Sequence, residues 1–99
     1  MTRKEVLEKA EGCVCKNRED EYGSPEDSFG VIAKMWEGYL SGTLQQPEVV
    51  IERKDVAAML ALLKIARIAC GIFHADNWVD LAGYAACGGE LEAPDTKKN

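Results

Sequence analysis

Hydrophobic positions recur along most of this chain at the three- and four-residue spacing of amphipathic helices, and no segment alternates as a β-strand would. The pattern predicts four helices, over about residues 2–21, 24–40, 47–73 and 76–91. The second shows it most clearly, because Phe29, Ile32, Ala33, Trp36 and Leu40 follow one helical face. We therefore predict an all-α fold.

Residues that start or stop helices mark most of the boundaries. Ser24 followed by Pro25 predicts a helix start, with the serine as cap and the proline in the first turn. By the same rules we expect Pro47 to open the third helix and Asp76 to cap the fourth. Glycines predict the ends of helices: Gly23 ends the first, Gly42 the second, and the Gly88-Gly89 pair breaks the fourth. For Gly71 two roles stay open, the end of the third helix or a close helix crossing.

The third helix is apolar on nearly all sides from Val56 to Cys70. Such a helix is normally covered by its neighbours or by another subunit. Four short helices in 99 residues cannot easily cover every side of it. We expect a single domain over residues 1–93, similar to a four-helix bundle, that completes its core by oligomerisation, followed by a flexible tail at 94–99.

Composition removes several function classes. With 12 Lys and Arg against 17 Asp and Glu, the formal charge is −5, which argues against a nucleic-acid partner. Lys64 and Arg67 interrupt the longest apolar run, so we expect no membrane association, and without an apolar leader we expect a cytoplasmic location. The four cysteines are expected to be reduced and packed as small hydrophobes, since Cys70 and His74 supply too few ligands for zinc.

Charged residues within the apolar third helix are the candidate chemistry. At about 100° per residue, Arg53, Lys64 and Arg67 fall on one face and Glu52 and Asp55 on the adjoining one. Buried cations need carboxylates, an anionic ligand or water.

Two interpretations of these cations stay open. In the first, Asp76 and Asp80 neutralise Lys64 and Arg67 and join the last two helices, packed antiparallel. In the second, the cations bind phosphates, and an aromatic side chain stacks on a base. Tyr84, which shares a helical face with Asn77 and Asp80, and Tyr22, beside a glycine, are candidates for that stacking, whereas Trp36 is expected in the core.

Three short patterns together resemble a known family. They are Arg18-x-x-x-Tyr22-Gly23, Lys64-x-x-Arg67 and Asp76-Asn77-x-x-Asp80-x-x-Gly83-Tyr84. The family consists of small helical proteins of phages and prophages and carries only a domain-of-unknown-function label. It is similar in outline to the all-α nucleotide pyrophosphohydrolases of the MazG and dUTPase-like group, whose acidic E-x-x-E and E-x-x-D boxes hold magnesium and whose subunits form dimers or tetramers.

The sequence departs from the hydrolase pattern in one acidic box. Glu52-x-x-Asp55 matches a box, whereas Asn77-x-x-Asp80 replaces a carboxylate by an amide. Magnesium prefers hard, charged oxygens. The resemblance therefore favours nucleotide recognition over hydrolysis, with any oligomer a dimer or a tetramer.

We expect a phage-type binding protein that captures a small phosphorylated, nucleotide-derived molecule, with a host immune signal as one such ligand, and needs no cofactor. In a phage-encoded protein the site of action would be the host cytoplasm. The candidate ligand-binding residues are Arg18, Tyr22, Arg53, Lys64, Arg67, Asn77, Asp80 and Tyr84. One alternative is a Mg²⁺-dependent nucleoside triphosphate pyrophosphohydrolase with Glu52, Asp55 and Asp80 as metal ligands. The other is a structural helical interaction module.

Overall fold

The computed structural model describes residues 1–17 and 24–93, and within these ranges the chain is helical and contains no strand. Four α-helices and one π-helical segment follow each other along the chain: α1 (Arg3–Gly12), η1 (Cys13–Asn17), α3 (Pro25–Leu44), α4 (Arg53–Ala69) and α5 (Ala75–Glu92). The prediction of an all-α chain with four helices is confirmed for the described residues. None of their helices is long and apolar enough to cross a membrane.

Helix α1 and η1 together make up the first predicted helix as far as Asn17. Thr2 caps α1 reciprocally: the Glu5 N–H donates to Thr2 Oγ1 at 3.1 Å, and the Thr2 N–H donates to Glu5 Oε1 at 3.0 Å. The expected end of this helix at Tyr22-Gly23 lies outside the described residues, as do Arg18 and the tail at 94–99.

Helix α3 begins as predicted. Ser24 is the N-cap, its Oγ accepts the Asp27 N–H at 3.4 Å, and Pro25 occupies the first helical position. The helix continues past Gly42 to Leu44, and Gln45 then takes a left-handed conformation with φ 54°. The predicted end was therefore slightly early, because the turn that stops the chain forms at Gln45 and not at the glycine.

Helix α4 is shorter than predicted. Pro47 does not open it; the helix starts at Arg53 after Glu52, which forms a capping box with Asp55. The backbone before it runs back along α3, where the Ile51 N–H donates to the Glu37 carboxylate at 2.8 Å. Because this bond ties the backbone just before Glu52 to α3, the helix starts at the Glu52 cap and not at Pro47.

The turn between α4 and α5 is partly as expected. Gly71 has φ 98°, a conformation that favours glycine, and it closes α4, the first of the two roles expected for it. The expected cap at Asp76 is wrong, because His74 is the N-cap residue of α5 and Asp76 lies in its first turn.

The predicted break of the fourth helix at Gly88-Gly89 is also wrong, since α5 continues to Glu92. A Cβ placed at Gly88 would lie 3.2 Å from the Cβ of Ala57, so this glycine lets α5 approach α4 closely. Here packing between helices, and not backbone freedom, explains the glycine.

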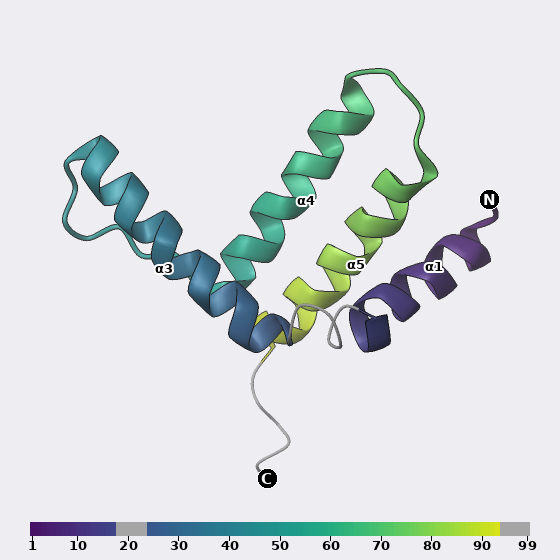
Figure 1. Cartoon of the computed structure of the whole chain (residues 1–99), viewed down its shortest axis with the longest axis horizontal. Helices are drawn as coiled ribbons and strands as arrows, with labels where there is room; N and C mark the ends of the chain where they lie inside the picture. Colours follow the sequence, from purple (N-terminus) through teal and green to yellow (C-terminus); the bar gives the residue numbers. More distant parts are fainter. Residues whose placement is uncertain (18–23, 94–99) are drawn as a thin grey trace, which may run out of the picture.

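The helices pack as a row in which α4 and α5 form a central antiparallel pair, with α1 against α5 and α3 against the first half of α4 (Figure 1). The antiparallel arrangement confirms the expected packing of the last two helices. The core lies where α3, α4 and α5 meet, and Phe29 and Val56 are completely buried. Trp36 packs against this core but is only half-buried.

Toward its C-terminal end α3 leans away from α4, leaving an open angle between the two helices (Figure 1). Consequently α4 is covered by α5 and partly by α3, while Met59, Leu62 and Leu63 on its remaining side are exposed. Residues 1–17 and 24–93 thus do not cover the most apolar helix of the chain.

None of the four cysteines forms a disulfide bond. The expectation that they are packed as small hydrophobes holds for Cys87, which is buried in the core. It is wrong for Cys13, Cys15 and Cys70, which are exposed because η1 and the end of α4 turn these positions away from the core.

Candidate functional site

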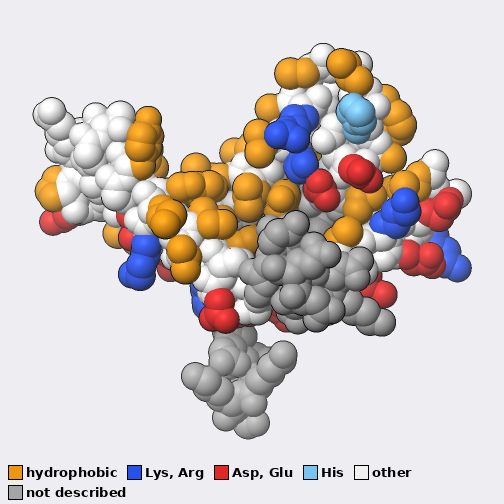
Figure 2. Space-filling model, viewed as in Figure 1, with side chains coloured by type: hydrophobic (Ala, Val, Ile, Leu, Met, Phe, Trp, Pro, Cys, Tyr) orange, Lys and Arg blue, Asp and Glu red, His pale blue; other side chains and the backbone are white. Residues whose placement is uncertain are grey.

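A hollow of about 510 Å³ lies where α4 ends and α5 begins. Its volume falls in the range of small-molecule sites, roughly 300–1,000 Å³. Basic and acidic side chains and the histidine gather at this end of the helix pair (Figure 2). The lining consists of Lys64, Arg67, Cys70, Ile72, His74, Asp76, Asn77 and Asp80. Four of the predicted ligand residues are therefore brought together: Lys64, Arg67, Asn77 and Asp80.

Lys64 and Asp80 form the strongest ion pair of the hollow. Lys64 Nζ lies 2.8 Å from Asp80 Oδ2, with side-chain exposures of 13% and 35%. Partial burial reduces the screening of such a pair by water and salt. The ammonium of Lys64 is thus neutralised within the chain, as the structural interpretation predicted, and Asp80 is its only ion-pair partner among the described residues.

Arg67 stands one turn further along α4 and has a different environment. Its side chain is exposed, and it forms no ion pair with any described residue. Of the two cations that the structural interpretation neutralised with Asp76 and Asp80, only Lys64 is paired among the described residues, and its partner is Asp80. A guanidinium in this situation presents a planar set of donors that match carboxylate or phosphate oxygens.

The first turn of α5 brings two kinds of charge to the same hollow: the partial positive charge of its backbone N–H groups and the carboxylate of Asp76. His74 is the N-cap residue, and its side chain accepts no capping hydrogen bond from the helix. Backbone N–H groups in the first turn of a helix lack intrahelical partners, and the helix macrodipole favours an anion there. Asn77 is buried at 7% exposure, so its amide is part of the inner wall.

Other predicted ligand residues lie elsewhere. Arg53 is at the opposite end of α4, about 16 Å from Lys64 by helical rise, where Nη1 donates to the Glu26 carbonyl oxygen at 3.4 Å. The predicted basic stripe is therefore not one site. Tyr84 is half-buried against the core and lines a separate small hollow next to Asp80. Arg18 and Tyr22 lie outside the described residues.

The acids of the enzyme alternative are not gathered. Glu52 and Asp55 cap α4 at its start: the Glu52 N–H donates to Asp55 Oδ2 at 2.9 Å, and Lys54 Nζ approaches Oδ1 at 3.0 Å. Together these donors hold the pKa of Asp55 below its ordinary value, with the backbone N–H of Glu52 the larger cause. Asp80 belongs to the far end of the helix pair, and within residues 1–17 and 24–93 no three acidic, histidine or cysteine side chains form a possible metal site.

Four lining residues were not among the predicted ligand residues: Cys70, Ile72, His74 and Asp76. All four come from the end of α4, the short turn and the first turn of α5. The sequence could have indicated these residues, because a short connection between antiparallel helices brings the end of one helix beside the start of the next. A second hollow of similar size, 530 Å³, is lined by α1 and its capping residue alone, so no second element encloses it.

Comparison with known proteins places residues 5–92 in a match to a family model described as "Domain of unknown function (DUF6378)". Two curated proteins are similar to the chain. The "Gene 55 protein" of Mycobacterium phage D29 is 38% identical over 82 residues, covering 83% of this chain and 50% of the relative. The "Gene 55 protein" of Mycobacterium phage L5 is 34% identical over 93 residues, covering 94% and 56%.

The chain thus spans about half the length of the curated relatives that it matches. No solved structure matches it significantly. The predicted resemblance to a phage family of unknown function is confirmed. None of these matches is to a nucleotide pyrophosphohydrolase, so the outline similarity to the MazG and dUTPase-like group stays a prediction.

Proposed function

Because this chain belongs to the family described as Domain of unknown function (DUF6378) and resembles phage proteins, we propose that it is a phage-type binding protein that captures a small phosphorylated, nucleotide-derived molecule without hydrolysing it. The proposed site is the hollow between α4 and α5. The proposed use is removal of a nucleotide signal made by the host.

The observation that supports this proposal is a difference in ion pairing between two neighbouring cations. Lys64 is held by Asp80, whereas Arg67 has no ion pair among the described residues and faces the same hollow as the first turn of α5. A guanidinium beside a helix N-terminus is a combination that suits phosphate oxygens. In this proposal the Lys64–Asp80 ion pair forms one side of the hollow and helps to position Arg67.

Capture without hydrolysis is favoured by where the acids lie. Metal-assisted phosphoryl chemistry requires carboxylates that fix the ion over the phosphates. Glu52 and Asp55 instead bind the first turn of α4, at the opposite end from the hollow.

Calorimetry against cyclic nucleotides and ADP-ribose-type nucleotides tests the proposal. We expect at least one of them to bind and to be recovered intact after the protein is denatured. Absence of binding across the panel would contradict capture. Recovery of cleaved product, in the presence of Mg²⁺, would instead support the pyrophosphohydrolase alternative.

The structural alternative has one observation in its favour, the 2.8 Å contact between Lys64 and Asp80. This pair alone would explain two of the charges as a bridge between helices. Lys64→Met separates the two interpretations: a purely structural pair changes stability or assembly and leaves no ligand affinity to lose, whereas a pocket wall also weakens nucleotide binding.

A further inference from the structure

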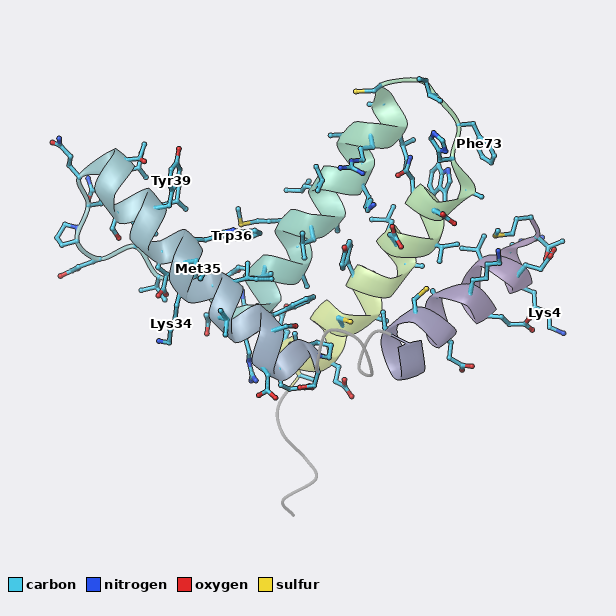
Figure 3. The ribbon with its side chains drawn as sticks, viewed as in Figure 1. Lys4, Lys34, Met35, Trp36, Tyr39 and Phe73 are labelled. Atoms are coloured by element: carbon cyan, nitrogen blue, oxygen red, sulfur yellow. The ribbon has the colours of Figure 1, made fainter. Side chains whose placement is uncertain are left out.

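Large apolar side chains are exposed along the open angle between α3 and α4. We call this surface the α3–α4 face; its members are Val31, Met35, Tyr39, Met59, Leu62 and Leu63. Tyr39 is 72% exposed, Met35 70% and Leu62 61%. Figure 3 shows Trp36 and Tyr39 on the side of α3 that faces α4, and Figure 2 shows hydrophobic side chains continuing across the angle.

The exposed residues form continuous stripes on both helices. On α3, Val31, Met35 and Tyr39 are four residues apart and share one side. On α4, Leu62 and Leu63 lie three and four residues after Met59, so the three side chains share one side of the helix. No charged residue occurs between Val56 and Leu63, since the charges of α4 lie before and after this stretch. This stretch of α4 therefore lacks the polar residues that normally cover a helix exposed to water.

The size of the α3–α4 face suits a subunit interface. Its six side chains expose on the order of 600 Å², near the upper end for a patch on a monomer and approaching the roughly 800 Å² that each partner buries in a stable interface. Backbone and flanking side chains add to this area when two helices meet. Leu7, which is 64% exposed on α1, lies outside this face.

Two glycines of α3 lie on the side of the helix that carries Met35 and Tyr39. Gly38 and Gly42 follow these residues by three positions, and no described residue lies within 4 Å of a Cβ placed at either. Glycine in a helix interior is less favourable than alanine unless packing requires it. No contact within the described residues requires these two, and they leave room for a helix to pack closely against this side.

We propose that the α3–α4 face binds a second copy of this chain in a twofold dimer. Both sides of the open angle are apolar, so one copy's α3 stripe can pack into the angle of the other while the reverse contact forms at the same time. The dimer covers the side of α4 that one chain leaves exposed. The surface is separate from the hollow that contains Arg67, so dimerisation and nucleotide capture fail independently in experiment.

Light scattering coupled to size-exclusion chromatography, run over a range of protein concentrations, measures the mass of the full chain. We expect twice the chain mass of 10.9 kDa. The double variant Met35→Glu/Leu62→Glu is expected to run as a monomer, because it places charges within the contact. Leu7→Glu, at a position that is 64% exposed on α1, is the matched control and is expected to stay dimeric.

Circular dichroism verifies that the double variant keeps its helices. If it does not, Gly42→Ala gives an independent test, because alanine favours the helix yet blocks close approach; we expect it to raise the dimer dissociation constant several-fold. A wild-type chain that is monomeric at all concentrations would overturn the proposal. So would a folded double variant that remains dimeric, or a Gly42→Ala dimer of unchanged affinity.

Discussion

Lys64 and Arg67 are one helical turn apart on α4 but differ in what they contact. Lys64 is 13% exposed and meets Asp80, while Arg67 is exposed and has no ion pair among the described residues. Sequence spacing showed that both cations share a face, and it indicated that the carboxylates of α5 lie opposite. It could not show which cation takes Asp80, because that depends on the relative height of two helices and on side-chain direction.

The Lys64–Asp80 pair is expected to stabilise the fold measurably. A double-mutant cycle with Lys64→Met and Asp80→Asn, followed by urea unfolding, should give a coupling free energy of about 1 kcal/mol, because the pair is partly buried. The matched control is the pair of Lys4 and Glu8 on α1, 3.8 Å apart with exposures of 85% and 62%, for which we expect coupling near zero. Equal coupling in the two cycles would contradict this account.

Asp55 is expected to make stability depend on acid pH. The Glu52 N–H and the Lys54 ammonium hold its pKa in the folded chain below the ordinary value of 3.8. As the pH falls, the unfolded chain therefore takes up this proton first. The stabilisation is complete above the unfolded pKa and is lost as the pH falls through the folded pKa.

Urea unfolding between about pH 6 and pH 3 measures this contribution. The Asp55→Asn variant is expected to lose stability less steeply with acid than the wild type. Glu11→Gln, which removes an exposed carboxylate on α1 with no ion pair among the described residues, is the control and should follow the wild type. If the stability of Asp55→Asn fell with pH as steeply as that of the wild type, the capping box would not be the cause of this acid dependence.

At the scale of the helix, the start of α3 was predictable from its side-chain cap, whereas the cap of α5 at His74 and the roles of several glycines were not. Ser24-Pro25 opened α3 as expected, because both residues act on the backbone next to them. Pro47 failed to open α4, because a tertiary contact, the bond from the Ile51 N–H to Glu37, holds the backbone before Glu52, and the local capping box of Glu52 with Asp55 starts the helix instead. Glycine is ambiguous in sequence because a helix end and a close helix contact both require it: Gly71 is the first case and Gly88 the second.

The glycines of α5 give a test of that distinction. A Cβ placed at Gly83 would lie 2.9 Å from Val14 Cγ1, and a β-branched side chain has little freedom to move away. We expect Gly83→Ala to destabilise the chain by about 1–3 kcal/mol despite the better helix propensity of alanine. Gly89→Ala, where nothing lies within 4 Å, should be neutral or stabilising by up to about 1 kcal/mol. Thermal unfolding of both variants checks the pair, and equal shifts would contradict the packing explanation.

For the molecule as a whole, periodicity was enough to predict four helices, the antiparallel α4–α5 pair and a third helix too apolar for one chain to cover. It was not enough to predict how the charged residues are distributed in space. Arg53 shares a helical face with Lys64 and Arg67, but a face extends along the whole helix, and Arg53 lies at its other end beside Glu26. The same reasoning explains why Glu52 and Asp55 do not meet Asp80.

The central claim is that Lys64 is held by Asp80 at the side of the hollow, whereas Arg67 is available to bind a phosphate. One comparison tests this claim most directly. Isothermal titration of a nucleotide that binds the wild type should be repeated with Arg67→Met and with Arg53→Met, which removes the same charge at the far end of α4. A charge-assisted bond to phosphate is worth roughly 1.5–3 kcal/mol, so we expect Arg67→Met to lose between about tenfold and a hundredfold in affinity and Arg53→Met to bind as the wild type does. Unchanged binding in Arg67→Met, or equal loss in both variants, would contradict the assignment of the site.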